Sequence, residues 1–137
     1  MKVILDTNVL ISGLLWSGVP SQILNLVEED KIKLCFTLKT LSELESVLQY
    51  SKFIPFLQKM EVNVDKLINR LSERAIVSSK NLKIKVITED PSDNKFLACA
   101  LIVKASYIVS GDKHLLNLKK FQNIPILTPK QFLAKIK

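Results

Sequence analysis

Acidic side chains recur at the ends of predicted strands in this chain. Asp6, Asp93 and Asp112 each follow a segment with strand character, either directly or within a few residues. In an open α/β sheet the carboxyl ends of the strands form the edge at which ligands bind. Carboxylates that meet there repel one another and raise their pKa values unless a cation neutralises them. The pattern therefore predicts a cation site at one edge of a sheet.

The expected cation is Mg²⁺ or Mn²⁺, because hard divalent ions prefer oxygen ligands. Zinc is not expected, since His114 is the only histidine and Cys35 and Cys99 lack the paired spacing of a zinc site. A cation held by carboxylates can bind a phosphodiester oxygen and lower the pKa of its bound water. The predicted chemistry is phosphodiester hydrolysis.

Each acidic position also has a purely structural interpretation. Asp6 and Asp112 can cap the helices that follow them, and Asp93 can interact with a helix dipole. Glu43 stands three residues after Thr40 and can complete a capping box with it. Taken one at a time, these alternatives stay open, and the recurrence at one edge favours function.

The charge balance points to a polyanionic partner. The net charge is +7, the pI is near 9.5, and lysine supplies nearly all of the positive charge. No acidic residue follows Asp112, whereas lysines recur to the end of the chain. We predict that Lys113, Lys119 and Lys120 contact an RNA backbone, although a merely soluble lysine-rich surface would look the same.

Strands and helices alternate along the chain, which indicates a three-layer α/β/α sandwich with a mainly parallel, five-stranded sheet. Pro20, Pro91 and Pro129 stand near the starts of three of the expected helices. The expected strands are 2–5, 32–37, 83–87, 107–109 and 125–127, and the expected helices include 40–50, 56–76, 93–105 and 114–118.

Length and composition fit one domain over residues 1–137. The longest apolar run, 96–103, is far shorter than the roughly 20 residues of a membrane span. Asp6 interrupts the apolar start, so we expect it to be structure and not a signal sequence. Cys35 and Cys99 are expected to be buried reduced thiols in a cytoplasmic protein.

Four segments in this order and spacing resemble the PIN-domain nucleases, and most closely the PIN-family, VapC-like toxins of toxin–antitoxin pairs. The resemblance covers about residues 2–133. The segments are VILDTNVLIS (3–12), LSELESVL (41–48), DPSDNKFLACAL (90–101) and YIVSGDKHLL (107–116).

The resemblance places the family's four acidic positions at Asp6, Glu43, Asp93 and Asp112. It implies an endoribonuclease that uses Mg²⁺ or Mn²⁺ and leaves a 5′-phosphate and a 3′-hydroxyl. It also implies a sheet of order 3-2-1-4-5, a homodimer and a cognate antitoxin. Auxiliary roles would fall to Thr7, Asn8, Asp90 and Ser110. Asn94 departs from the pattern, because close relatives often carry another Asp there.

Three other functions compete with this interpretation. A haloacid-dehalogenase-type phosphatase needs a second Asp at the position of Asn8, and a phospho-receiver domain needs an acidic pair that the chain does not show. The serious alternative is a non-catalytic RNA- or protein-binding module with a structural metal site. Metal-dependent cleavage, lost in Asp6→Asn, distinguishes the enzyme from the module.

Overall fold

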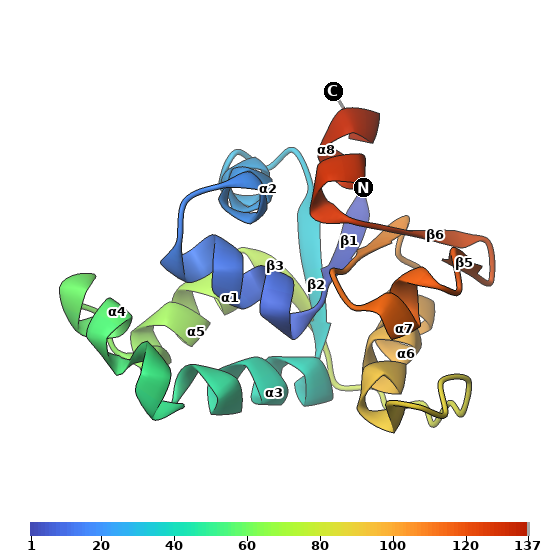
Figure 1. The fold of residues 1–137 in the computed structure, drawn as a ribbon, viewed down its shortest axis with the longest axis horizontal. Helices are drawn as coiled ribbons and strands as arrows, with labels where there is room; N and C mark the ends of the chain where they lie inside the picture. The colour runs from blue at the N-terminus through green and yellow to red at the C-terminus, as the bar shows by residue number, and fades with distance from the viewer. Residues whose placement is uncertain (137) are drawn as a thin grey trace.

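The computed structural model describes residues 1–136, and within them six strands form a sheet at the centre of the molecule (Figure 1). Their order is β3-β2-β1-β4-β6-β5, and every pair is parallel except β5 with β6. The predicted number of five strands is one too few, because the sheet also has the short antiparallel edge strand β5. The strands are β1 Lys2–Leu5, β2 Lys33–Thr37, β3 Ala75–Ser78, β4 Tyr107–Val109, β5 Lys120–Phe121 and β6 Ile124–Leu127.

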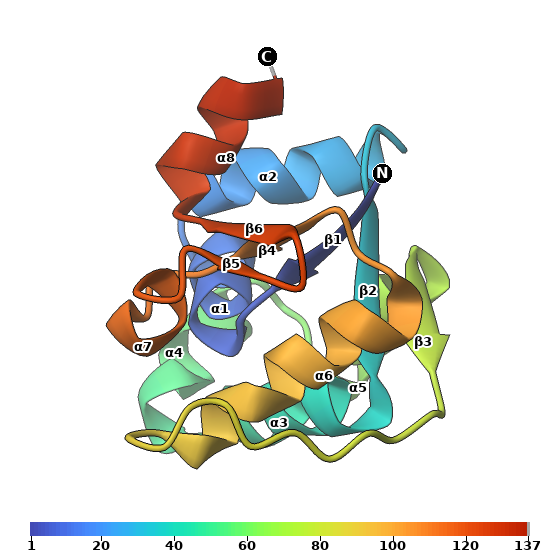
Figure 2. The same ribbon diagram turned by 90° about the vertical axis from the view of Figure 1, so that its right-hand side faces the viewer.

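Helices cover both faces of the sheet, which confirms the predicted three-layer sandwich (Figures 1 and 2). One face carries α1 Thr7–Leu15, α2 Val19–Glu28, α3 Leu38–Leu48, α5 Val64–Glu73 and α8 Pro129–Ile136. The other face carries α6 Asn94–Val103 and α7 Lys113–Leu116. The remaining short helices are η1 Ser51–Phe53, α4 Ile54–Lys59 and η2 Pro91–Asp93.

Strand β1 shows how an apolar run becomes the centre of the sheet. Val3 and Leu5 belong to the core under α1 and α2, whereas Ile4 belongs to the core under α6. All three are at most 2 % exposed. Alternation of side chains along a strand therefore fills both cores, and burial of each such side chain contributes about 1.5–3 kcal/mol. Asp6 follows at the point where the strand must leave the sheet.

The third strand does not lie where the sequence pattern places it. The predicted strand 83–87 is wrong, because residues 79–90 form an irregular segment. Asn94 Oδ1 accepts hydrogen bonds from the N–H groups of Val86 and Ile87, which therefore need no strand partner. The predicted helix 56–76 is wrong in two places. It is broken between α4, which ends at Lys59, and α5, which begins at Val64, and beyond Glu73 residues 75–78 pair with β2 as the edge strand β3.

Helices α1 and α2 meet at a glycine. A Cβ added at Gly13 would lie 2.7 Å from Cδ1 of Leu24 and 2.9 Å from the carbonyl oxygen of Pro20. Gly18 begins α2 at φ +131°, a conformation that L side chains rarely adopt. Glycine at these two positions lets the chain turn sharply between α1 and α2.

Among residues 1–136, no single helix is long and apolar enough to cross a membrane. The pair α1 and α2 reaches that length and apolarity only together, with an 86° bend between them. Cys35 and Cys99 are buried free thiols, as predicted, and burial raises the pKa of Cys99 to about 12.

Candidate metal centre

Asp6 lies at the junction between β1 and α1. Its Oδ1 accepts a hydrogen bond from the N–H of Val9 at 2.8 Å, so it caps α1, and its Oδ2 accepts a hydrogen bond from Ser110 Oγ. The residue is only 4 % exposed, and burial raises the pKa of its carboxyl although the bond from Ser110 opposes that rise. The capping and the functional interpretations are therefore compatible at this position.

Ser110 joins the ends of the neighbouring strands β1 and β4. Its hydroxyl donates to Asp6 and accepts a hydrogen bond from the N–H of Asp112 at 2.9 Å. Asp112 in turn caps α7, because its Oδ1 accepts from the N–H of His114 at 2.7 Å. A fully buried serine thus fixes two of the predicted acids relative to each other.

Asp93 is the least satisfied of the acids. It lies at the start of α6 and is 8 % exposed, and its Oδ2 has no hydrogen-bond partner among the described residues. Burial and the negative charges of Asp112 and Asp90 raise the pKa of Asp93 to about 7. A buried carboxylate oxygen without a donor is costly, and a divalent cation would relieve that cost.

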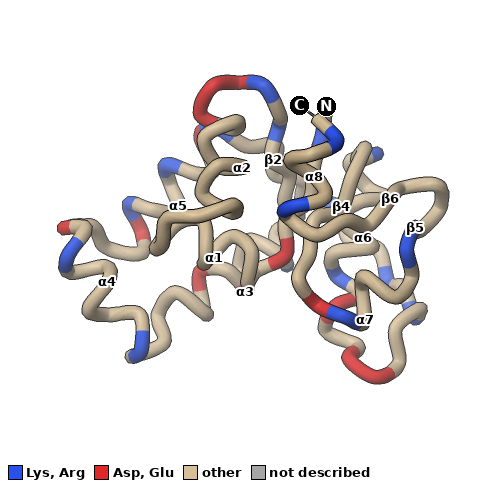
Figure 3. Tube along the Cα trace, turned by 45° about the horizontal axis from the view of Figure 1, so that its top comes forward, with Lys and Arg blue, Asp and Glu red and all other residues tan. Residues whose placement is uncertain are grey.

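Asp90, Asp93 and Asp112 form a close group in which one oxygen of each lies within 4.8 Å of the others. The acidic turn before α6 therefore lies beside the start of α7 (Figure 3). Two of the four predicted metal residues, Asp93 and Asp112, belong to this group, and Asp6 and Glu43 do not. Asp90, for which the resemblance implies only an auxiliary role, completes it. The residues present fit a hard divalent cation, because the ligand set is oxygen only and one oxygen is unpaired.

Glu43 lies on α3 outside this group. The capping box of α3 is formed by Thr37 and Thr40, so the interpretation of Glu43 as a capping residue is wrong. Its Oε2 accepts a hydrogen bond from Thr7 Oγ1 at 2.6 Å, and its Oε1 lies 3.0 Å from Lys95 Nζ. Glu43 therefore contacts the residue after Asp6, and both of its carboxylate oxygens are already paired.

Lys95 is a site residue that the sequence pattern does not reveal. It lies in the first turn of α6, two residues after Asp93, and its side chain is 22 % exposed. In the sequence, a lysine two residues after Asp93 cannot be distinguished from an ordinary solvent-exposed helix residue. Only the fold shows that it meets Glu43, which lies on a different helix.

Asn94 has a structural task that explains its departure from the family pattern. Its Oδ1 accepts from two backbone N–H groups of the 79–90 segment, and its Nδ2 donates to the carbonyl oxygens of Ile87 and Pro91. All polar atoms of the amide are therefore engaged. An Asp here could not donate these last two bonds.

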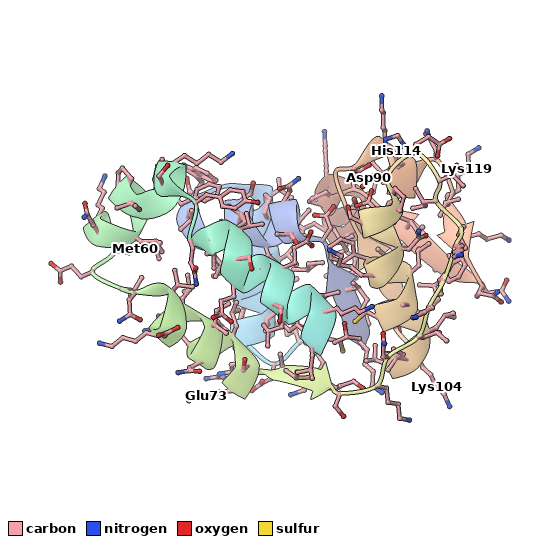
Figure 4. All side chains as sticks on the ribbon, turned by 90° about the horizontal axis from the view of Figure 1, so that it is seen from below. Met60, Glu73, Asp90, Lys104, His114 and Lys119 are labelled. Carbon is pink, nitrogen blue, oxygen red and sulfur yellow. The ribbon has the colours of Figure 1, made fainter. Side chains whose placement is uncertain are left out.

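A hollow of about 450 Å³ lies beside the acids and is lined by Asn8, Asp90, Gly111, Asp112, Lys113 and His114. Figure 4 shows Asp90 and His114 together near one end of α6, with Lys104 at its opposite end and Lys119 farther out. Of the three lysines predicted to contact RNA, the structure places Lys113 at the hollow, whereas Lys119 and Lys120 are exposed near β5.

These features define a class: a mainly parallel α/β protein with a group of three carboxylates that could hold a cation. A family model described as PIN domain matches residues 2–114, and the chain belongs to the PIN-domain family. PIN domains are generally nucleases that use divalent metal ions. A comparison with curated proteins finds no match.

Proposed function

We propose that the protein is a metal-dependent endoribonuclease that hydrolyses RNA phosphodiester bonds. The observation that carries this proposal is the unpaired, buried Oδ2 of Asp93, within an oxygen cluster completed by Asp90 and Asp112. Membership of the PIN-domain family supports the nuclease class. The basic net charge supports a polyanionic substrate.

Asp93, Asp112 and Asp90 would hold the cation, with Asp6 next to them across Ser110. When bound, Mg²⁺ or Mn²⁺ supplies a Lewis acid for the phosphate oxygens and an activated water. Hydrolysis would leave a 5′-phosphate and a 3′-hydroxyl.

The surrounding residues orient the acids and the substrate. Ser110 holds Asp6 in place, and Thr7 holds Glu43. Asn8 and Lys113 line the hollow, where an amide and an ammonium group can bind phosphate oxygens. These are the auxiliary roles that we assign to them.

We further propose that this nuclease is the VapC-like toxin of a toxin–antitoxin pair, acts in the cytoplasm and forms a homodimer. The antitoxin would place a basic side chain against the acidic group, because the repulsion among those carboxylates favours a cationic partner. Co-expression with the product of the adjacent reading frame tests this: a true antitoxin co-purifies and suppresses cleavage.

Cleavage of RNA by purified wild type and Asp6→Asn, resolved on a gel with Mn²⁺, Mg²⁺ or EDTA, tests the nuclease. Asn keeps the helix cap but not the charge, so we expect a fall in rate of about 100-fold or more with the fold intact. Asp65→Asn, the same change at an exposed position of α5, is the matched control and should cleave normally.

Two results would contradict the proposal. Equal rates for Asp6→Asn and wild type would remove Asp6 from the site. RNA that wild type binds but does not cleave with either metal would favour the non-catalytic binding module, to which the pairing of Glu43 with Lys95 lends some support.

A further inference from the structure

We propose that a second groove, separate from the hollow at Lys113, binds a single-stranded segment of the RNA next to the cleaved bond. This inference rests on the proposed ribonuclease function. The groove has a volume of about 600 Å³ and lies between the start of α3, the 79–85 segment and α6. Figures 2 and 4 show residues 79–90 running along α6 from β3 toward the acidic turn. We call this 600 Å³ groove the lysine groove.

Charge is the first reason for a nucleic-acid ligand. Five lysines and no acidic residue line the groove. Residues 79–88, which form part of its wall, carry three lysines and no acidic residue. Closely spaced ammonium groups repel one another and attract a phosphate backbone. The five are Lys39, Lys80, Lys83, Lys85 and Lys95.

The apolar residues that line the groove favour a single strand over a duplex. Leu82, Ile84 and Ile102 are among its lining residues, and most of its exposed lining is apolar. Leu82 is 43 % exposed, so its side chain is available for contact. Bases can lie against apolar side chains only if they are unstacked and turned away from a partner strand. The lysines and the apolar side chains of this lining match the backbone and the bases of such a strand.

Residues next to Asp93 in the chain also line the lysine groove. Ser92, Asn94 and Lys95 line it, and they flank Asp93 in sequence. Lys95 is in both places, because it lines the groove and pairs with Glu43. An RNA strand that has its scissile phosphate at the acids therefore has a basic path away from them along α6. The hydrogen bonds of Asn94 to Val86 and Ile87 hold the wall of this path in position.

The test is RNA affinity, measured without turnover. A fluorescently labelled, unstructured 12-nucleotide RNA is titrated with protein in EDTA, and binding is followed by anisotropy over a range of salt concentrations. The variant Lys80→Gln/Lys83→Gln/Lys85→Gln removes three exposed charges. For single strands the slope of log K against log[salt] changes by about 0.7 per phosphate contact, so it should become less steep by about 2. Affinity in 0.1 M salt should fall about 100-fold.

Two matched proteins separate the groove from general effects. Lys59→Gln/Lys66→Gln/Lys135→Gln removes the same net charge from exposed positions on α4, α5 and α8, and should keep the wild-type slope. The triple arginine variant at positions 80, 83 and 85 keeps the groove charge and should also keep that slope. Thermal melts of all the proteins establish that each is folded.

An unchanged slope in the groove variant would overturn the proposal, as would a loss of slope confined to Lys119→Gln/Lys120→Gln. Binding of an acidic, leucine-containing peptide that is lost in the groove variant, while RNA binding is unaffected by that variant, would overturn it in favour of a protein ligand. The ribonuclease proposal fails separately: groove-dependent binding without cleavage in Mn²⁺ would refute catalysis and leave the RNA groove standing.

Discussion

Replacing Asp93 with asparagine should stabilise the metal-free protein at alkaline pH. In the folded chain, burial and the charges of Asp112 and Asp90 raise the pKa of Asp93 from 3.8 to about 7. For a carboxylate fully shielded from water, that rise corresponds to about 4 kcal/mol of lost stability above pH 7. Because the neighbouring acids are only half-buried, solvent screening reduces the effect, and we expect about 2 kcal/mol.

The pH dependence has a definite sign. Below pH 3.8 both the folded and the unfolded states hold the proton, so Asp93 carries no penalty. Between pH 3.8 and about 7 the unfolded state releases its proton first, and the stability of wild type falls as the pH rises. Asp93→Asn has no such charge, so its advantage over wild type should be small at pH 4.5 and complete at pH 8.

Urea unfolding in EDTA at pH 4.5, 6 and 8 measures this difference directly. Glu61→Gln, an exposed acid changed in the same way, is the control and should follow wild type at every pH. Addition of Mn²⁺ at pH 8 should reverse the order, because a ligand at 100 times its Kd stabilises the wild type by about 2.7 kcal/mol. An Asp93→Asn protein that is less stable than wild type in EDTA at pH 8 would refute the reasoning.

Two further substitutions test the contacts that hold the 79–90 segment and the α1–α2 pair in place. Asn94→Ala removes four hydrogen bonds, three of them to the 79–90 segment, and should cost about 2–3 kcal/mol in urea unfolding, with faster proteolysis within that segment. Unaltered stability and proteolysis would contradict the anchoring role. Gly13→Ala places a methyl group 2.7 Å from Leu24 Cδ1 and 2.9 Å from the carbonyl oxygen of Pro20, and should lower stability by about 1–3 kcal/mol. A Tm equal to that of wild type would show that α2 can move away at little cost.

The strands at the centre of the sheet could be predicted because their sequences carry the signal locally. Residues 2–5 and 107–109 are short apolar runs that end at polar residues, and the structure has β1 and β4 at those positions. The edge strand could not be predicted, because 75–78 and 83–87 are both rich in branched residues. Which of the two segments forms the strand depends on tertiary contacts. Residues 75–78 pair with β2, whereas N–H groups of 83–87 donate hydrogen bonds to Asn94.

Some residues of the candidate site could likewise be predicted from the sequence, and others could not. Asp6 and Asp112 could be placed because each follows a central strand, and Ser110 then links them. The position of Glu43 could not be deduced, since its contacts are with Thr7, 36 residues away, and with Lys95 on another helix. Local spacing suggested a capping box with Thr40, and only the structure shows that Thr37 already forms it.

The hydrogen bonds of the acids also rank them as cation ligands. Asp6 uses one oxygen for the cap of α1 and the other for Ser110, and Glu43 uses both for Thr7 and Lys95. A cation can share those oxygens, because each carboxylate oxygen has more than one lone pair, but it gains less there than at an oxygen with no donor. Asp93 Oδ2 is such an oxygen. A bound cation would therefore depend most on Asp93, whereas at Glu43 it would have to share oxygens that Thr7 and Lys95 already contact.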